Sequence, residues 1–324
     1  MTRVFDLKYS RPKAGLTRRT FLGAACAVGA GAMAGGLPSG PLLAETKAHK
    51  FKVGEAELTV VSDGIFSLPR SFILADEKPE TVDALLTAHH APLDLKLETN
   101  VVLVRSGKTL ALIDTGGGTE FMASLGRLPD ALEGIGVDPD AITHVIFTHA
   151  HADHLWGAMD PFGDGARWPN ARHVITAVER DFWLKDGVEN RVPAAMKGMA
   201  LGIKRRIKTL GDTLTTAKDG EDIAPGIAFT TTPGHTPGHA SVVVRSGSED
   251  VIVGGDALTH AVISFAQPSW HWGSDYDKEG AAKTRARLLD RLASSKARLV
   301  GYHLPWPGVG VAEAAKGAYR FVPA

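Results

Sequence analysis

The feature that most constrains the fold of this chain is the segment Thr148-His149-Ala150-His151-Ala152-Asp153-His154. It directly follows Val145-Ile146-Phe147, an apolar run typical of a β-strand. Four of its seven residues carry imidazole or carboxylate groups, which suit zinc and similar divalent ions. A strand that ends here would place the first two histidines on one side, and the aspartate and last histidine could serve a second ion. The segment favours a metal site at a strand end over its alternative, a polar loop of surface histidines.

The first 44 residues have the features of an export signal. Thr17-Arg18-Arg19-Thr20-Phe21-Leu22 is a twin-arginine signature, and an apolar, Ala/Gly-rich run follows it up to about residue 37. That run is too short and too rich in glycine for a stable membrane anchor, and Leu42-Leu43-Ala44 offers a cleavage site. We expect the chain to pass, already folded, through the twin-arginine machinery to the periplasm or the exterior. Residues 1–44 are then expected to be removed, which leaves 45–324. The alternative is an N-terminal anchor or a disordered tail.

Removal of this leader changes the charge of the chain. Of 36 basic and 36 acidic residues in all, six basic and one acidic lie in the leader, which leaves 30 basic and 35 acidic residues. A net charge of −5 makes nucleic acid a poor partner. The only cysteine, Cys26, also lies in the leader, so the mature chain has no disulfide and depends on its core for stability.

Strand-like and helix-like segments alternate along the mature chain. The patterns predict hairpins at 51–64, with an Asp63-Gly64 turn, and at 100–114, and helices at 121–135 and 281–292. Residues 162–210 are expected to form helices in a lid-like insertion, whose basic run is interpreted as a solvated helix face. Because many strand pairs look like hairpins, mixed sheets covered by helices are favoured over a doubly wound parallel sheet.

Three further ligand candidates follow the same logic as the histidine segment. His235 lies in a Pro/Gly-rich turn, Asp256 ends the strand-like run Val251-Ile252-Val253-Gly254-Gly255-Asp256, and His303 ends Leu299-Val300-Gly301-Tyr302-His303. A metal site needs several ligands that are held on rigid elements and converge on one point. Strand ends provide such elements.

With these motifs in this order, the sequence resembles the metallo-β-lactamase superfamily over nearly all of the mature chain. The matching motifs are His149-x-His151-x-Asp153-His154, Thr232-Pro233-Gly234-His235-Thr236-Pro237-Gly238-His239, Gly255-Asp256 and Gly301-Tyr302-His303. The resemblance implies an α+β fold, an αβ/βα sandwich of two mixed β-sheets flanked by helices. It also implies two divalent ions, zinc first, with manganese, iron or cobalt as alternatives. One ion would take His149, His151 and His235, the other would take Asp153, His154 and His303, and Asp256 would bridge both.

Two ions held about 3.5–4 Å apart can share a bridging hydroxide and polarise a substrate oxygen. Asp256 and Asp153 are therefore the predicted catalytic residues, and the charge of Asp256 would keep two dications together. Asp114, in the turn after Leu112-Ile113, is expected to accept a hydrogen bond from a ligand histidine or from the motif backbone. Its alternative is a plain turn carboxylate. His239 is expected to support the His235 turn.

Within the superfamily, the chain looks most like the methyl parathion hydrolase-like and lactonase-like metallohydrolases. The shared segments are Leu97-Glu98-Thr99-Asn100, Ile113-Asp114-Thr115-Gly116, Ser124-Leu125-Gly126-Arg127-Leu128, Asp181-Phe182-Trp183-Leu184 and Tyr319-Arg320-Phe321-Val322-Pro323. In that group aromatic residues wall the leaving-group pocket, and Phe121 and Trp183 match two such positions. Their alternative is ordinary core packing. Thr259, where relatives carry an apolar residue or tyrosine, and His260 are further pocket candidates, and the Trp270-His271-Trp272 insert departs from the group.

These expectations combine into a hydrolase of a small molecule with an ester-like bond: a lactone, a carboxylester or a phosphotriester. The alternatives are β-lactam hydrolysis on the same site and a mononuclear iron sulfur dioxygenase. Retention of all seven ligands favours two metals over one. Related enzymes are often dimers, so the resemblance also suggests a homodimer.

Overall fold

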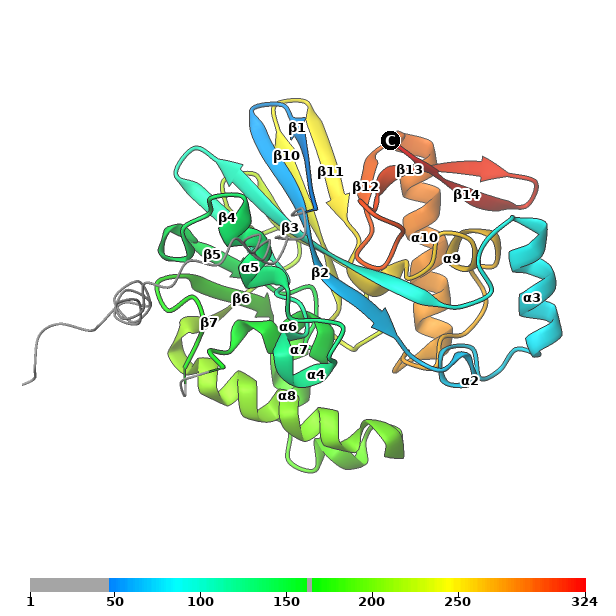
Figure 1. Ribbon diagram of the computed structural model, residues 1–324, viewed down its shortest axis with the longest axis horizontal. Helices are drawn as coiled ribbons and strands as arrows, with labels where there is room; N and C mark the ends of the chain where they lie inside the picture. Colours follow the sequence, from blue (N-terminus) through cyan, green and yellow to red (C-terminus); the bar gives the residue numbers. More distant parts are fainter. Residues whose placement is uncertain (1–46, 162–164) are drawn as a thin grey trace, which may run out of the picture. The chain divides into compact units, whose positions relative to one another are not determined.

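Two seven-stranded β-sheets form the centre of the chain in the computed structural model, which describes residues 47–161 and 165–324 (Figure 1). The first sheet has the order β1 (Ala48–Val53), β2 (Ala56–Ser67), β3 (Lys96–Ser106), β4 (Thr109–Ile113), β5 (His144–Ile146), β6 (Arg172–Thr176) and β7 (Leu214–Ala217). The second has the order β14 (Ala318–Pro323), β13 (Val309–Ala315), β12 (Arg298–Val300), β11 (Glu249–Val253), β10 (Ala240–Ser246), β9 (Ile227–Thr231) and β8 (Asp222–Ala224). The predicted leader, 1–44, lies outside the described residues.

Both sheets are mixed, as predicted for this α+β class. In the first, β1 to β4 pair antiparallel and β4 to β7 pair parallel. In the second, β11 and β12 pair parallel, and the other neighbours pair antiparallel. Because parallel neighbours end at the same edge of a sheet, the loops that follow them lie close together.

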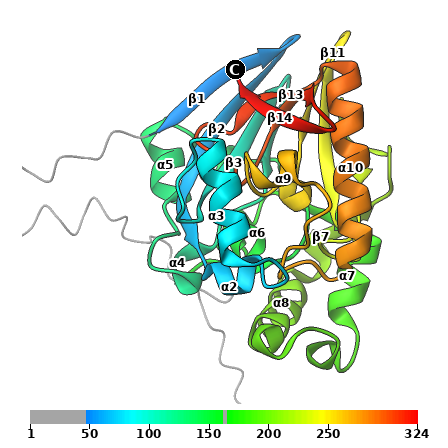
Figure 2. The same cartoon turned by 90° about the vertical axis from the view of Figure 1, so that its right-hand side faces the viewer.

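Helices cover the outer faces of the two sheets. The α-helices are α2 (Arg70–Ile73), α3 (Pro79–Ala88), α4 (Gly118–Phe121), α5 (Leu128–Gly134), α6 (Ala152–Leu155), α7 (Ala177–Leu184), α8 (Lys197–Leu210), α9 (Ile263–Ala266) and α10 (Lys278–Ser295). Short 3₁₀ turns span Pro139–Ala141, Trp156–Ala158, Val188–Asn190, Ala194–Met196, Gly211–Thr213 and Gly255–Ala257. In Figure 2, α10 and α5 lie on opposite sides of the strands.

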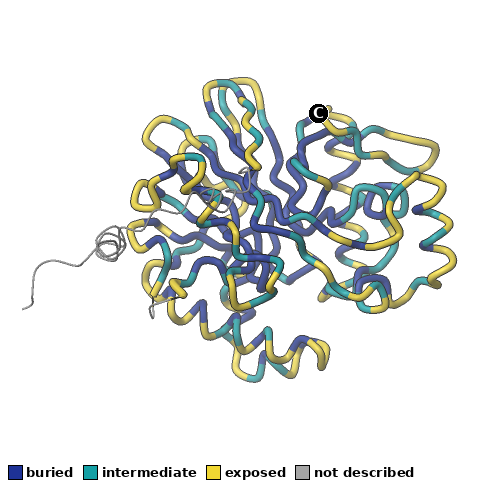
Figure 3. Tube along the Cα trace, viewed as in Figure 1, coloured by how far each residue is buried: buried dark blue, intermediate teal, exposed yellow. Residues whose placement is uncertain are grey.

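Three of the four clusters of buried apolar side chains hold the sheets and their helices together. One cluster joins the inner faces of both sheets, from Val102 and Ile113 to Phe229 and Val242. A second packs the first sheet against α5, α7 and α8, and a third packs the second sheet against α9 and α10. Figure 3 shows the strands mostly buried, with exposure concentrated on outer helices and loops. The expected sandwich of two mixed sheets between helices is therefore confirmed.

Local sequence explains where several helices begin. Thr176 accepts a hydrogen bond from Glu179 N at the start of α7, and Asp277 accepts one from Gly280 N at the start of α10. Such side-chain caps satisfy N–H groups that have no partner inside the helix. Pro129 lies in the first turn of α5, where its missing N–H leaves no helical hydrogen bond unmade. The helix expected over 121–135 therefore begins only at Leu128.

Three local predictions differ from the structure. Asp63-Gly64 is no turn, because β2 continues to Ser67 through a bulge between Ser62 and Ile65. The segment 162–210 contains strand β6 as well as helices, since this short run lies between β5 and β7 in the sheet. Arg206 in the basic run is 3% exposed, because it packs on the Trp156 ring and pairs with Glu120.

No helix within 47–161 and 165–324 combines the length and the apolar character needed to cross a membrane.

Candidate metal centre

Strand ends from both sheets bring the predicted ligands to one place. The loop after β5 carries His149 and His151, and the short helix α6 carries the next two ligands. The segments after β9, β11 and β12 carry His235, Asp256 and His303. The histidine segment lies beyond the end of β5 at Ile146. The directions of its side chains are therefore set by the loop backbone and not by the alternation of a strand.

The buried ligand side chains form three groups, and within each group the ligand atoms lie within 4.8 Å of one another. These groups are His149, His151 and His235; His149, His154 and Asp256; and Asp153, His154 and His303. The first and third groups coincide with the two ligand sets that the resemblance implies. The remaining group connects those sets.

Asp256 lies between the two sets. Its Oδ2 is 3.2 Å from His235 Nε2, while its Oδ1 is 3.1 Å from His154 Nε2 and 3.4 Å from His303 Nε2. The two oxygens of one carboxylate therefore face different sets. A carboxylate in this place can contact two cations and offset part of their mutual repulsion.

Several buried ligand atoms make no hydrogen bond within the described part of the chain. These atoms are His149 Nε2, Asp153 Oδ2, His154 Nε2 and Asp256 Oδ1; the last two lie 3.1 Å apart but do not have hydrogen-bond geometry. Buried polar atoms are normally paired, and an unpaired one costs about 1–3 kcal/mol. Imidazole nitrogens and carboxylate oxygens are donors that divalent ions accept. The residues therefore fit divalent metal ions.

The ionisation of these groups is strongly perturbed. Burial lowers the pKa of His149 well below its usual value, and the nearby His154 adds to this effect. Burial also disfavours the cations of His235 and His303, but Asp256 and other carboxylates outweigh it and raise these pKa values to about 9 and about 10. Burial opposes ionisation of Asp256, yet the surrounding histidines hold its pKa well below the ordinary value. Because metals bind the unprotonated nitrogen, metal binding would release protons.

Asp114 and His239 lie directly behind the ligands. Asp114 accepts hydrogen bonds from His154 Nδ1 and from Thr148 N, both at 2.8 Å. His239 Nε2 accepts one from Asp256 N at 2.9 Å. Burial, helped by His235, lowers the pKa of His239 to about 3, so this ring is a neutral acceptor. Asp114 thus contacts a ligand histidine and the motif backbone, and the contact of His239 is to the backbone of Asp256.

Glu179 on α7 is a supporting residue that the sequence reasoning missed. Its side chain is fully buried and accepts hydrogen bonds from Ala150 N, Trp183 Nε1, Thr236 Oγ1 and Gly238 N at 2.6–3.0 Å. One carboxylate thus ties the loop after β5 to the loop after β9. Its sequence signal is weak, because a glutamate in the first turn of a helix is common.

Asp63 in the bulge of β2 was also missed as a supporting group. It accepts hydrogen bonds from Gly117 N, Gly126 N and Leu128 N at 2.9–3.0 Å, and so fixes the loop that carries α4. Burial raises its pKa to about 6 even though these backbone groups lower it. Asp275, on the segment after α9, is a third buried carboxylate and contacts His235.

Two of the predicted pocket residues, Phe121 and Trp183, lie near the ligand histidines but differ in burial. Phe121 packs on Phe66, whose ring is 5.3 Å from that of His303, so these two partly exposed rings lie beside the centre. Phe66 had not been predicted there. Trp183 is 1% exposed and lies behind His151, with ring centroids 5.9 Å apart.

The remaining two pocket candidates make local contacts. Thr259 is buried, and its N–H donates to Ser264 Oγ at 3.1 Å. His260 is partly exposed, and its Nδ1 accepts hydrogen bonds from Val262 N and Ile263 N at the start of α9. Burial lowers the pKa of His260 to about 4. The backbone contacts of His260 fix the turn that leads from Asp256 to α9.

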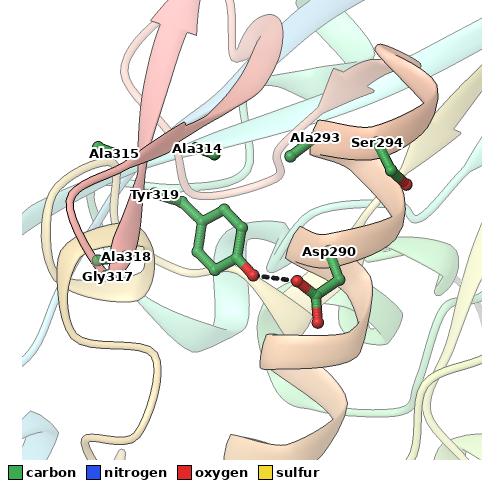
Figure 4. Close-up of a pocket in the computed structure, with 8 residues that line it drawn as sticks. All are labelled: Asp290, Ala293, Ser294, Ala314, Ala315, Gly317, Ala318 and Tyr319. Atoms are coloured by element: carbon green, nitrogen blue, oxygen red, sulfur yellow. Dashed lines mark hydrogen bonds between the residues drawn. The ribbon is translucent and has the colours of Figure 1, made fainter.

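A separate surface hollow of about 440 Å³ lies between α10 and the β13–β14 hairpin (Figure 4). Small side chains line most of it, and the Tyr319 hydroxyl donates a hydrogen bond to Asp290 across it. It shares no residue with the predicted metal ligands. The buried His/Asp groups are therefore the candidate functional site.

Known proteins with similar sequences are metallohydrolases and lactonases by name. A "probable metallo-hydrolase" of Mycobacterium bovis and one of Mycobacterium tuberculosis are each 26% identical over 211 residues, 56% of this chain. The chain spans 66% of the length of these relatives, just under two thirds. The N-acyl homoserine lactonase AttM of Rhizobium radiobacter is 30% identical over 123 residues, 36% of this chain and 41% of AttM.

Solved structures with this fold include a dizinc enzyme. AidC, described as a dizinc quorum-quenching lactonase, has a TM-score of 0.82 and 26% identity over 86% of this chain and 98% of its own. The hydrolase AbOPH, described as a member of the beta lactamase superfamily, has a TM-score of 0.79 and 28% identity, with the same coverage. Residues 96–303, more than half of the chain, match the family described as the metallo-beta-lactamase superfamily. The chain belongs to this superfamily.

Proposed function

We propose that this chain is a hydrolase that uses two divalent metal ions, zinc first, to cleave a small ester-like substrate. Among lactones, carboxylesters and phosphotriesters, a lactone is the first class to test, because AidC and AttM are lactonases by name. The observation that carries the proposal is the group of buried ligand atoms without hydrogen-bond partners, arranged on both sides of Asp256. Such an arrangement suits two ions better than one.

The proposed mechanism assigns distinct tasks to the residues of the chain. When bound, two divalent ions supply a nucleophile at neutral pH and a Lewis acid for the substrate oxygen. Asp256 faces both ligand sets, and Asp153 lies 3.2 Å from His303 Nε2 in the second set. Phe66 and Phe121 offer an apolar surface beside the second set, where an acyl or aryl group of the substrate can pack.

We further propose that the protein acts in the periplasm or outside the cell. The support is the twin-arginine signature and the apolar run in residues 1–44, which lie outside the described residues. Export of a folded chain would allow the centre to fill in the cytoplasm, before periplasmic metals compete for it. Metal-free precursor in the cytoplasm that is loaded only after export would refute this order of events.

Metal analysis of the purified mature chain, with a hydrolysis screen, tests the main proposal. The screen contains a lactone, an aryl ester, a phosphotriester and a β-lactam. We expect about two equivalents of metal per chain, lactone hydrolysis in the wild type, and loss of that activity in Asp256→Ala. Asp212→Ala, which removes an exposed carboxylate, is the control and retains activity. One equivalent of iron with oxygen uptake on persulfides, or hydrolysis of the β-lactam alone, would refute the proposal.

A further inference from the structure

The segment between α9 and α10 brings a buried ion pair against one ligand histidine. Asp275 Oδ1 is 2.9 Å from His235 Nδ1, and Asp275 Oδ2 accepts a hydrogen bond from Arg285 Nη2 at 3.2 Å. The side chains of these three residues are only 1–2% exposed. The segment includes the Trp270-His271-Trp272 insert, which the resemblance leaves without a role.

Arg285, on α10, holds this segment in shape. Its Nη1 donates to Pro268 O and to Trp270 O, both at 2.8 Å. The segment is also fixed at Gly273, whose N–H donates to Ile73 O at 2.8 Å. Contacts to Arg285 on α10 and to Ile73 on α2 therefore fix the segment that carries the Asp275 carboxylate.

The backbone of the same segment runs along the His235 turn. Tyr276 N donates to His235 O at 3.0 Å, and Asp277 N donates to Gly234 O at 2.9 Å. The segment thus holds His235 at two points: Tyr276 N binds its carbonyl oxygen, and Asp275 binds its ring. Its Nε2 is left to face Asp256 and His151.

Two histidines of the second ligand set also have hydrogen-bond partners at Nδ1. His154, in the second set, donates from Nδ1 to Asp114 at 2.8 Å. His303 Nδ1 lies 2.7 Å from the carbonyl oxygen of Glu98. Each set of ligands therefore contains one histidine that is held by a buried carboxylate: Asp114 for the second set, and Asp275 for the first.

We propose that Asp275, fixed by Arg285, is a positioning residue that selects the metal-binding tautomer of His235 and so sets the affinity of the first ligand set for its ion. The inference rests on the proposed two-metal function. A carboxylate can only accept, so it keeps a proton on Nδ1 and leaves the Nε2 lone pair free for a metal. Partners of this kind are typically worth 10- to 100-fold in metal affinity.

Asp275→Asn reverses this selection with little change in shape. Arg285 can only donate, so it draws the amide oxygen of the new side chain toward itself. The amide NH₂ group then faces His235 Nδ1 and favours the tautomer with the proton on Nε2. That tautomer must exchange its proton before the nitrogen can bind a metal.

The test measures zinc affinity by competition with a chromophoric chelator, using metal-free mature protein. We expect the wild type to bind two zinc ions. In Asp275→Asn, one zinc ion binds 10- to 100-fold more weakly, and the other stays within about threefold of the wild type. Asp277→Asn is the matched control: it makes the same chemical change two residues away, keeps a good helix cap, and leaves both affinities unchanged.

A double-mutant cycle separates positioning from a general structural effect. In His235→Ala, Asp275 has no ligand to position, so adding Asp275→Asn lowers the affinity by no more than about twofold. In the double variant Asp275→Asn/Arg285→Met, no donor draws the amide oxygen away, so this oxygen can turn toward His235 Nδ1. We expect the weak site to regain part of its zinc affinity relative to Asp275→Asn, which a general loss of folding would not produce. Fully additive losses in the cycle would overturn the inference.

The outcomes distinguish this inference from the function on which it rests. If the wild type binds no zinc or a single ion, the two-metal function fails. If the wild type binds two zinc ions and Asp275→Asn binds both with unchanged affinity, only the role of Asp275 fails.

Discussion

Replacement of Glu179 by glutamine tests whether a single carboxylate joins the two main ligand loops. Oε1 of Glu179 accepts from Ala150 N at 3.0 Å and from Trp183 Nε1 at 2.7 Å. Oε2 accepts from Thr236 Oγ1 at 2.6 Å and from Gly238 N at 2.9 Å. Glutamine can offer only one acceptor atom, because its NH₂ group is a donor.

The size of the effect follows from the groups left without partners. Whichever way the amide is turned, its NH₂ group faces two buried donors. Each buried donor that loses its acceptor costs about 1–3 kcal/mol, so the two together cost about 2–6 kcal/mol. For a chain of this size, that loss corresponds to a fall of about 4–24 °C in melting temperature, at about 2–4 °C per kcal/mol.

Thermal unfolding of the metal-free protein provides the assay, since metal binding would mask a change in the apoprotein. Asp181→Asn is the control, because it makes the same change at an exposed carboxylate on the same helix. We expect the control to melt within about 2 °C of the wild type. If Glu179→Gln melts as close to the wild type as this control does, the two loops do not depend on the carboxylate.

Three further predictions concern a buried histidine, the pocket wall and the metal ions. Within the described residues, the buried ring of His173 makes no hydrogen bond, and burial lowers its pKa from 6.5 to about 4. The unfolded state therefore takes up the histidine proton first as pH falls. Between pH 7.5 and 5, the free energy of unfolding of His173→Leu, measured with denaturant, should fall by about 2 kcal/mol less than that of the wild type. Equal falls in both proteins would refute this role of His173. Phe66→Ala should raise KM for acyl or aryl substrates about tenfold with metal content unchanged, whereas an unchanged KM would exclude the ring from the pocket. Chelation should lower the melting temperature, because ligand at 1,000 times its Kd stabilises by about 4 kcal/mol, and an unchanged melting curve would argue against bound ions.

The positions of the ligand candidates could be predicted because their signals are local. His149, Asp256 and His303 each follow a short apolar run, and a run of this kind predicts a buried strand whose end is fixed by the sheet. The sequence could therefore place chemistry at strand ends without knowing the order of the strands. The same local reasoning predicted the mixed sheets, because many strand pairs along the chain look like hairpins.

Residues whose roles depend on distant partners could not be predicted in this way. Asp63-Gly64 has the composition of a tight turn, but β2 pairs with β3 on both sides of it, and the pairing of a long strand outweighs the turn preference. Arg206 lies in a basic run that suggests a solvated face. Its burial depends on Trp156 and Glu120, which are distant in sequence.

The sequence can predict that buried acceptors are needed near the ligand loops, but it cannot predict which carboxylates provide them. Ligand loops leave the strand ladder, so their buried N–H groups need acceptors from elsewhere. Glu179 supplies acceptors for two ligand loops, and Asp63 supplies them for the loop that carries α4. Asp275 instead accepts from a ligand ring. A centre built on loops predicts that such acceptors exist, but any buried carboxylate within reach can serve, so tertiary packing alone decides which residues they are.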